Sequence, residues 1–320
     1  MKKLHYIFVI LLFSSNINGQ QQFVSTNFLM NDYYYNPAIA GSKDRHVANM
    51  SLRNQWSGFQ GAPTTMLANY YGSYLNQGKV GYGVSLISDK TGLVQNTGIY
   101  INYAQHFQLN EKIKLGFGVK PGYVQHRIKL YDAQVADEGD EILTGNILAA
   151  NALDLHSGFH LYSEDFFFMG SIQHLLGKSI QFTSYNQNLS KHFTLIGGYN
   201  HRIDKRKLAI QPSLMIKYVN PTPMQWTAML KATFDNKCWA GITYRSEDAA
   251  GIVLGYKILD RLSIGYGFDY SVGKITQYQS GSHELVISFV TTPNKPTLDE
   301  EDEELNKSIM DELNEKMKNK

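Results

Sequence analysis

The feature that most constrains the fold is an alternation of apolar and polar side chains, which recurs from about residue 46 to residue 290. Between Lys112 and Tyr123, apolar residues occupy every second position, and mostly lysines and glycines stand between them. The stretch from Arg261 to Tyr270 repeats this pattern. Because successive side chains of a strand point to opposite faces, each segment predicts a strand with one apolar and one polar face. Strands of about ten residues, tilted by about 45°, can cross the hydrocarbon core of a bilayer.

The repeat predicts an all-β fold, an antiparallel transmembrane β-barrel of about fourteen strands. This even number agrees with single-chain bacterial outer-membrane barrels, which have an even number of strands. The predicted strands cover residues 46–55, 64–75, 79–88, 97–108, 112–125, 152–162, 166–175, 191–202, 206–219, 223–234, 237–247, 250–258, 261–271 and 281–290. Every second connection is a tight polar turn, such as Asn110–Glu111. The other connections are mostly longer, notably residues 56–63, 88–96, 126–151, 176–190 and 272–280.

The difference between short and long connections assigns the two ends of the barrel. Outer-membrane barrels have short turns on the periplasmic side and long loops outside. With an even number of strands, we expect both termini in the periplasm. A soluble β-sandwich would also alternate, but it explains neither the asymmetry of the connections nor the repeated strand length.

The N-terminus has the features of a secretory signal peptide. Two lysines precede the apolar run Tyr6–Phe13, and small and polar residues follow up to Gly19. We therefore expect residues 1–19 to be removed and the mature chain to begin near Gln20. The mean hydropathy of -0.30 is compatible with a barrel, which needs only half of its residues apolar. The single cysteine, Cys238, excludes an intrachain disulfide framework.

Two segments flank the predicted barrel at residues 46–290: an N-terminal segment at 20–45 and a tail at 291–320. Within the tail, residues 297–320 carry nine acidic residues and four lysines, a net charge of −5. A capping-box pattern and apolar residues at i, i+4 spacing predict a short amphipathic helix there. The acidic tail is interpreted either as a periplasmic contact for a partner or as a solvated, frayed end. The apolar positions are Leu305, Ile309, Leu313 and Met317.

Several short motifs lie outside what the alternation requires. In chain order they are Tyr35–Gly41, Arg53–Gly58, Ala62–Thr65, Gly81–Val84, Asp89–Gly92, Phe167–Gly170, His174–Leu175, Trp239–Arg245 and Gly281–Leu285. The ordered set resembles the PorP/SprF family of Bacteroidetes type IX secretion membrane proteins over about residues 23–290. The acidic tail lies outside this resemblance.

The resemblance implies a non-enzymatic outer-membrane component of the type IX secretion system. Such a protein would assist the export or surface attachment of large cargo proteins, including gliding adhesins. The implied partners are the type IX translocon or a C-terminal domain of the cargo. Periplasmic secretion or gliding components are further candidates and would meet residues 297–320. The PorP-like and SprF-like branches of the family both remain open.

The candidate partner-binding residues come from the motifs and from the tail. We expect Tyr35–Gly41 to fold against or into the barrel before the first strand. The RNQW stretch places an arginine beside a loop mouth, which lipid anchoring does not explain, whereas Trp226 and Trp239 fit aromatic girdles at the bilayer edges. The proposed contacts are Tyr35, Asn36, Pro37, Arg53, Gln55, Trp56, Leu305, Ile309 and Leu313.

The sequence predicts no catalytic, cofactor or metal site. The ten histidines are scattered, and His156 and His160, four residues apart on a strand, are expected about 13 Å apart. The Gly-x-Gly pair Gly116 and Gly118 follows the strand period, so we interpret it as interior packing rather than as a nucleotide site. Acidic residues in 126–151 predict either a solvated surface or a calcium site.

Two other functions stay open as alternatives. Lumen-facing lysines and glycines would suit an outer-membrane porin-like channel for small solutes. An outer-membrane enzyme such as a lipid hydrolase would need a Ser/His pair at the bilayer rim, and no pattern in the sequence singles one out.

Overall fold

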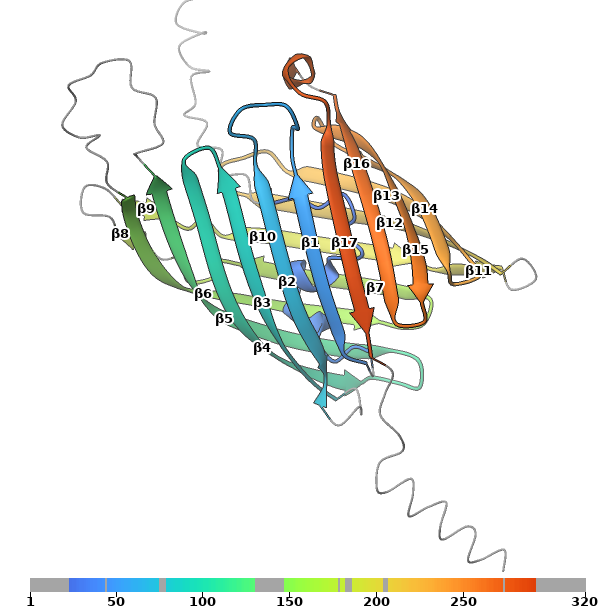
Figure 1. Cartoon of the computed structure of the whole chain (residues 1–320). Coiled ribbons are helices and arrows are strands. Elements are labelled where there is room, and N and C mark those ends of the chain that lie inside the picture. Colours follow the sequence, from blue (N-terminus) through green and yellow to red (C-terminus); the bar gives the residue numbers. More distant parts are fainter. Residues whose placement is uncertain are drawn as a thin grey trace, which may run out of the picture.

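The computed structural model describes residues 23–43, 45–74, 79–129, 147–177, 179–181, 186–203, 207–272 and 274–291. Fourteen antiparallel strands form a closed barrel, in which each strand pairs with its neighbours in the sequence (Figure 1). The ring closes where β1 pairs with β17, from Val47↔Val290 to Asn54↔His283. The fold class predicted from the alternation is therefore confirmed.

Each of the fourteen predicted segments overlaps one barrel strand. The barrel strands are β1 (Val47–Asn54), β2 (Thr64–Ser73), β3 (Val80–Thr91), β4 (Val94–Gln108), β5 (Lys114–Lys129), β6 (Ile147–Tyr162), β7 (Phe166–Gln173), β10 (His192–Tyr199), β12 (Leu208–Val219), β13 (Gln225–Phe234), β14 (Cys238–Arg245), β15 (Ala249–Leu259), β16 (Leu262–Ser271) and β17 (Ser282–Val290). The short strand β11 (His201–Ile203) continues β10 along β12. A separate hairpin, β8 (Ser179–Gln181) with β9 (Asn186–Asn188), lies in the β7–β10 connection.

One connection differs from the sequence-based expectation. Residues 88–96 were expected to form a long outer loop, but β3 and β4 stay paired up to Thr91↔Val94, so the connection is a tight turn. The ladder continues because Gly92 adopts a φ of 56°, a left-handed conformation that glycine tolerates at a hairpin. At the next outer connection, residues 130–146 of the predicted calcium loop lie outside the described residues.

The outer face of the barrel is apolar and the inner face is polar. On β5, Phe117 and Val119 are 52% and 45% exposed, whereas Gly118 and Lys120 are buried. This is the reverse of a soluble protein, and it suits a wall that faces lipid. Trp226 and Trp239 lie near opposite ends of the wall, at the start of β13 and of β14 respectively. Among the residues that the structure describes, no helix is long and apolar enough to cross a membrane.

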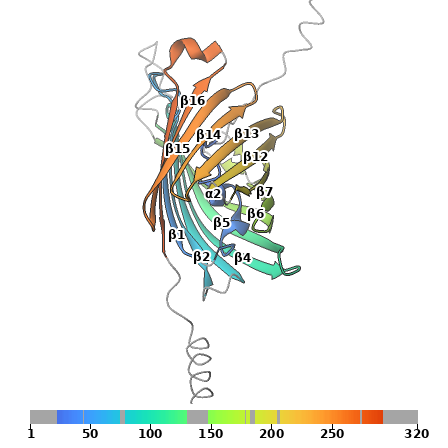
Figure 2. The same cartoon turned by 90° about the vertical axis from the view of Figure 1, so that its right-hand side faces the viewer.

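The barrel interior is filled by the chain's own N-terminal segment. We call residues 23–43 the lumen segment; it contains α2 (Asp32–Tyr35) and the 3-10 turn η1 (Pro37–Ile39) (Figure 2). Its apolar side chains form the main core together with inward-facing wall residues. The segment expected to fold against or into the barrel therefore lies inside it.

The lumen segment runs through the barrel from one end to the other. Phe23 contacts Lys217, near the long-loop end of β12, and Ala40 packs against Gly81 at the short-turn end of β3. Thr291 follows β17 at that same short-turn end. Phe23 and Thr291 thus lie at opposite ends of the barrel. The barrel wall begins at β1 and ends at β17 on the short-turn side, as expected, whereas Phe23 lies at the other end because the lumen segment runs through the interior. The termini themselves lie outside the described residues.

Candidate functional site

The long-loop end of the lumen segment is held by one buried carboxylate, Glu284 of β17. Its Oε1 accepts hydrogen bonds from the Ser25 hydroxyl and from Asn31 Nδ2, the latter at 2.8 Å. Its Oε2 accepts the backbone N–H of Thr26 at 2.7 Å. A single side chain of the wall therefore fixes both ends of the stretch from Ser25 to Asn31.

Two arginines and a second carboxylate surround this contact. Arg53 of β1 donates to Asp269 Oδ2 of β16 at 2.7 Å, and its other terminal nitrogen lies 3.4 Å from Glu284 Oε2. Arg245 of β14 lies 3.4 Å from the same oxygen of Asp269. The Thr26 hydroxyl donates to Asp269 at 2.8 Å and accepts from Arg53 at 2.5 Å. Because removing one partner of a buried ion pair costs about 3–5 kcal/mol, this network anchors the segment firmly.

Lysines of the wall bind backbone carbonyl groups of the lumen segment. Lys217 Nζ of β12 donates to the Phe23 carbonyl at 3.3 Å, and Lys120 Nζ of β5 donates to the Tyr33 carbonyl at 2.9 Å. The Lys120 ammonium also lies 4.0 Å from the centroid of the Tyr33 ring. These lysines satisfy carbonyl groups that would otherwise be buried without partners.

Three consecutive tyrosines, Tyr33–Tyr35, occupy the middle of the lumen. The Tyr33 ring stacks on Tyr71 of β2 with ring centroids 4.2 Å apart. The Tyr35 hydroxyl accepts the backbone N–H of Ser25 at 2.8 Å, which ties α2 to the start of the segment. All three tyrosine side chains are buried between the lumen segment and the wall.

Asn36 joins the lumen segment to two neighbouring strands. Its Nδ2 donates to the Phe159 carbonyl of β6 at 2.8 Å and to the Gly170 carbonyl of β7 at 3.1 Å. Its Oδ1 accepts the backbone N–H of Ala38 at 2.8 Å and caps η1. Asn36 therefore uses both ends of its amide, and no other residue type matches that set of donors and acceptors at the same length.

We expect Asn36→Ala to destabilise the folded barrel by about 1–3 kcal/mol, because it leaves buried carbonyl and N–H groups without partners. Urea unfolding in lipid vesicles measures this change. Asn54→Ala, on the exposed face of β1, is the matched control and should shift stability by less than about 0.5 kcal/mol. Equal stability of the two variants would contradict the proposed anchoring by Asn36.

Two strand glycines give the lumen segment the room that it needs. A Cβ at Gly118 of β5 would lie 2.5 Å from the Ala38 nitrogen, and a Cβ at Gly81 of β3 would overlap the Ala40 carbonyl. The interpretation of the strand-period glycines as interior packing is confirmed at Gly118.

The rim at the long-loop end is held together by backbone contacts between two connections. The Trp56 N–H donates to Ser282 Oγ at 3.1 Å, and the Ser57 N–H donates to the Gly281 carbonyl at 2.8 Å. Trp56 and its neighbour Gln55 are half-buried in this rim. Their side chains thus lie where a molecule outside the barrel end could reach them.

The structure separates the predicted partner-binding residues into three groups. Gln55 and Trp56 lie at the rim. Arg53 was placed beside a loop mouth, but it is only 1% exposed, because β1 directs it inward onto buried carboxylates; this part of the prediction is corrected. Buried in the lumen segment against the wall are Tyr35, Asn36 and Pro37. Outside the described residues are Leu305, Ile309 and Leu313.

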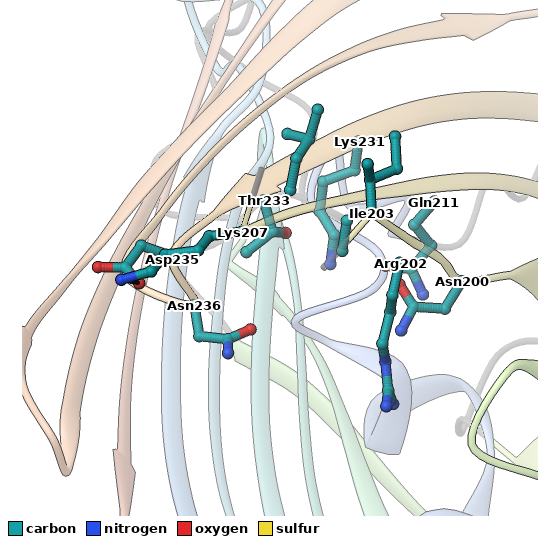
Figure 3. Close-up of a pocket in the computed structure, with 11 residues that line it drawn as sticks. Asn200, Arg202, Ile203, Lys207, Gln211, Lys231, Thr233, Asp235 and Asn236 are labelled. Atoms are coloured by element: carbon teal, nitrogen blue, oxygen red, sulfur yellow. Dashed lines mark ion pairs between the residues drawn. The ribbon is translucent and has the colours of Figure 1, made fainter. Parts of the chain in front are cut away.

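A polar cavity of about 690 Å³ opens in the lumen at the short-turn end, along β11, β12 and β13 (Figure 3). Three cationic side chains, Arg202, Lys207 and Lys231, line it together with Asp235. Lys207 Nζ pairs with Asp235 Oδ1 at 3.3 Å. The lumen segment therefore leaves a basic vestibule at this end of the barrel.

Sequence reasoning missed one cluster of ligand-type side chains. Asp154 and His156 of β6 meet His174, which follows β7, and their donor atoms lie within 4.8 Å of one another. Asp154 and His156 stand two residues apart, a spacing that puts both side chains on one face of a strand, so an Asp-x-His search would have found this pair. His174 comes from a separate segment, and only the folded chain brings it in.

A closed barrel with an apolar outer wall and a polar, filled lumen defines an outer-membrane β-barrel protein. Residues 17–289 match the family model of the type IX secretion system membrane protein PorP/SprF. The chain therefore belongs to the PorP/SprF family, as the motifs indicated, and is an outer-membrane component of the type IX secretion system. Family and fold point to a role without catalysis. No curated protein sequence matches the chain significantly.

The chain resembles several solved structures at very low sequence identity. The Pseudomonas putida toluene transporter TodX is 9% identical with a TM-score of 0.50, covering 82% of this chain and 94% of that chain. The CymD monoaromatic hydrocarbon channel is 10% identical with a TM-score of 0.48, covering 85% and 93%. The Acinetobacter baumannii outer membrane protein Omp33 is 12% identical with a TM-score of 0.45, covering 78% and 100%. These similarities concern the fold alone.

Proposed function

We propose that this protein is a closed platform rather than a conduit: it assists type IX export or surface attachment of large cargo proteins, such as adhesins. The observation that carries the proposal is the lumen segment, which crosses the whole interior and is bonded to the wall along its length. Because this segment occupies the interior, we expect neither a folded cargo nor a stream of solutes to pass through the barrel. The function then lies at the two ends of the barrel.

In this proposal the long-loop end faces outward and the short-turn end faces the periplasm. Outward orientation of the longer connections is the rule for outer-membrane barrels. The rim around Trp56 would contact exported cargo, and the basic vestibule and the acidic tail, residues 297–320, would meet periplasmic components of the secretion system.

Deletion of the gene is expected to remove type IX cargo from the cell surface while small-molecule uptake continues. Antibody labelling of intact cells measures surface cargo, and total cell protein shows whether the cargo is still made. Within the rim, Trp56→Ala should reduce cargo recovered with the tagged protein. Trp226→Ala, at the same end but 39% exposed on the outer wall, should not. Normal surface display without the gene would refute the proposal.

The alternative of a porin-like channel makes an opposite prediction. Wild-type protein in planar lipid bilayers is expected to show no steady conductance, because the lumen segment blocks the path. The measurement is single-channel current in symmetrical salt. A steady, ion-conducting state of the intact protein would favour the porin-like channel instead.

A further inference from the structure

The middle of the lumen wall contains a set of three side chains that suits a metal ion. Asp154 Oδ2 lies 2.9 Å from His156 Nε2 and 2.7 Å from His174 Nδ1. Asp154 and His156 are buried, and His174 is half-buried. Two imidazole nitrogens and one carboxylate oxygen are a common ligand set for zinc.

We propose that Asp154, His156 and His174 bind a zinc ion that ties β6 to the chain leaving β7. Ligands at about 2.0–2.1 Å in a tetrahedral site are about 3.3 Å apart, so each of the two contacts of Asp154 Oδ2 needs to lengthen by only about half an ångström. The two imidazole nitrogens already lie within 4.8 Å of each other. A water molecule would take the fourth position.

The proposed zinc site lies where the pairing of β6 with β7 ends, so an ion there would link the two segments. The β6–β7 ladder ends at Ser157↔Ile172, while β6 continues towards the long-loop end without β7 as a neighbour. His174 turns the chain with a φ of 55°, a left-handed conformation that glycine adopts most readily. A histidine is more strained than glycine in this conformation, and the contact of its imidazole with Asp154 offsets that cost.

The surrounding groups allow the exchange of a proton for a metal ion. Asp154 Oδ2 also accepts the Tyr100 hydroxyl at 3.0 Å, and Asp154 Oδ1 accepts the Leu155 N–H at 2.8 Å, so the carboxylate is held in place from both sides. Among the described residues, Nδ1 of His156 has no hydrogen-bond partner, so the ring can carry its proton there while Nε2 binds the ion.

Calorimetric titration of the EDTA-treated, full-length protein with Zn²⁺ tests the site. One ion per barrel should bind with micromolar or tighter affinity. Asp154→Asn, His156→Gln and His174→Asn should each weaken binding by more than about 10-fold. His160→Gln is the matched control, since His160 is buried on the same face of β6 and contacts Tyr162 instead. Absence of zinc binding, or equal loss in the control, would overturn the proposal.

A second measurement uses only the wild-type protein, so it does not depend on whether the variants fold. X-ray absorption of the zinc-loaded wild-type protein should show two imidazole nitrogens and light oxygen ligands at about 2.0–2.1 Å. The folded state of each variant is checked by the faster migration of unheated barrels in gels. A zinc shell made mostly of water or carboxylate oxygen would also overturn the assignment.

Discussion

Glu284→Ala is expected to loosen the lumen segment and to destabilise the barrel by about 3–5 kcal/mol. The substitution removes the acceptor of three hydrogen bonds from Ser25, Thr26 and Asn31. Among the described residues, it also leaves the buried guanidinium group of Arg53 with one carboxylate partner, Asp269, to which Arg245 lies at 3.4 Å as well. Urea unfolding in lipid vesicles measures the loss of stability. Planar-bilayer recordings should show current bursts that the wild type lacks.

Glu164→Ala is the control for this experiment. Glu164 is an exposed carboxylate whose closest contact with Arg202 is 3.6 Å, so its removal should change stability by less than about 1 kcal/mol. Glu284→Gln, which keeps the acceptor oxygen and loses the charge, should lie between the two. Equal stability of Glu284→Ala and Glu164→Ala, with no current bursts from either variant, would show that this network does not anchor the lumen segment.

Gly81→Val should displace the short-turn half of the lumen segment. Even a Cβ at this position would overlap the backbone of Ala40, and backbone atoms cannot rotate away as the end of a flexible side chain does. Overpacking of this kind costs about 1–3 kcal/mol or more, although valine itself favours strands. Unfolding in vesicles measures the cost, and protease cleavage within residues 36–43 reports the displacement.

Two controls distinguish the two ways in which Gly81→Val could act, by overlap with the lumen segment or by distortion of the β3 strand. Gly197→Ala of β10 places its Cβ 3.5 Å from the nearest atom, an ordinary contact, and should be nearly neutral. In a chain that lacks residues 23–43, Gly81→Val should change the free energy of unfolding little, because the backbone of Ala40 that it would overlap is absent. A large cost that persists in the shortened chain would assign the effect to the β3 strand itself.

Much of the fold could be read from the sequence. Each of the fourteen predicted segments overlaps one barrel strand, and residues such as Phe117 and Lys120 face the sides that the alternation assigned to them. The exception, residues 88–96, failed because a two-residue turn at Gly92 and Leu93 leaves no break in the pairing. Loop length depends on where cross-strand pairing stops, which polarity alone does not reveal.

The candidate site was less accessible to sequence reasoning. The motif Tyr35–Gly41 was expected to enter the barrel or lie against it, and it fills the lumen. Arg53 was interpreted as a partner contact because lipid anchoring does not explain an arginine beside a loop mouth. The structure pairs it instead with Asp269 and Glu284, which lie 216 and 231 residues away. His174 likewise meets Asp154 only where β7 ends beside β6.

The sequence alone determined the strands, the side of the wall on which each residue lies, and the family. These properties follow from short-range patterns, because both the two-residue period of a strand and the motifs involve residues that are close together in the sequence. Only the tertiary structure decided what fills the lumen, at which end of the barrel Phe23 lies, and which buried charges neutralise each other. Those outcomes depend on barrel closure, which brings β1 against β17 and places the lumen segment among side chains from almost every strand.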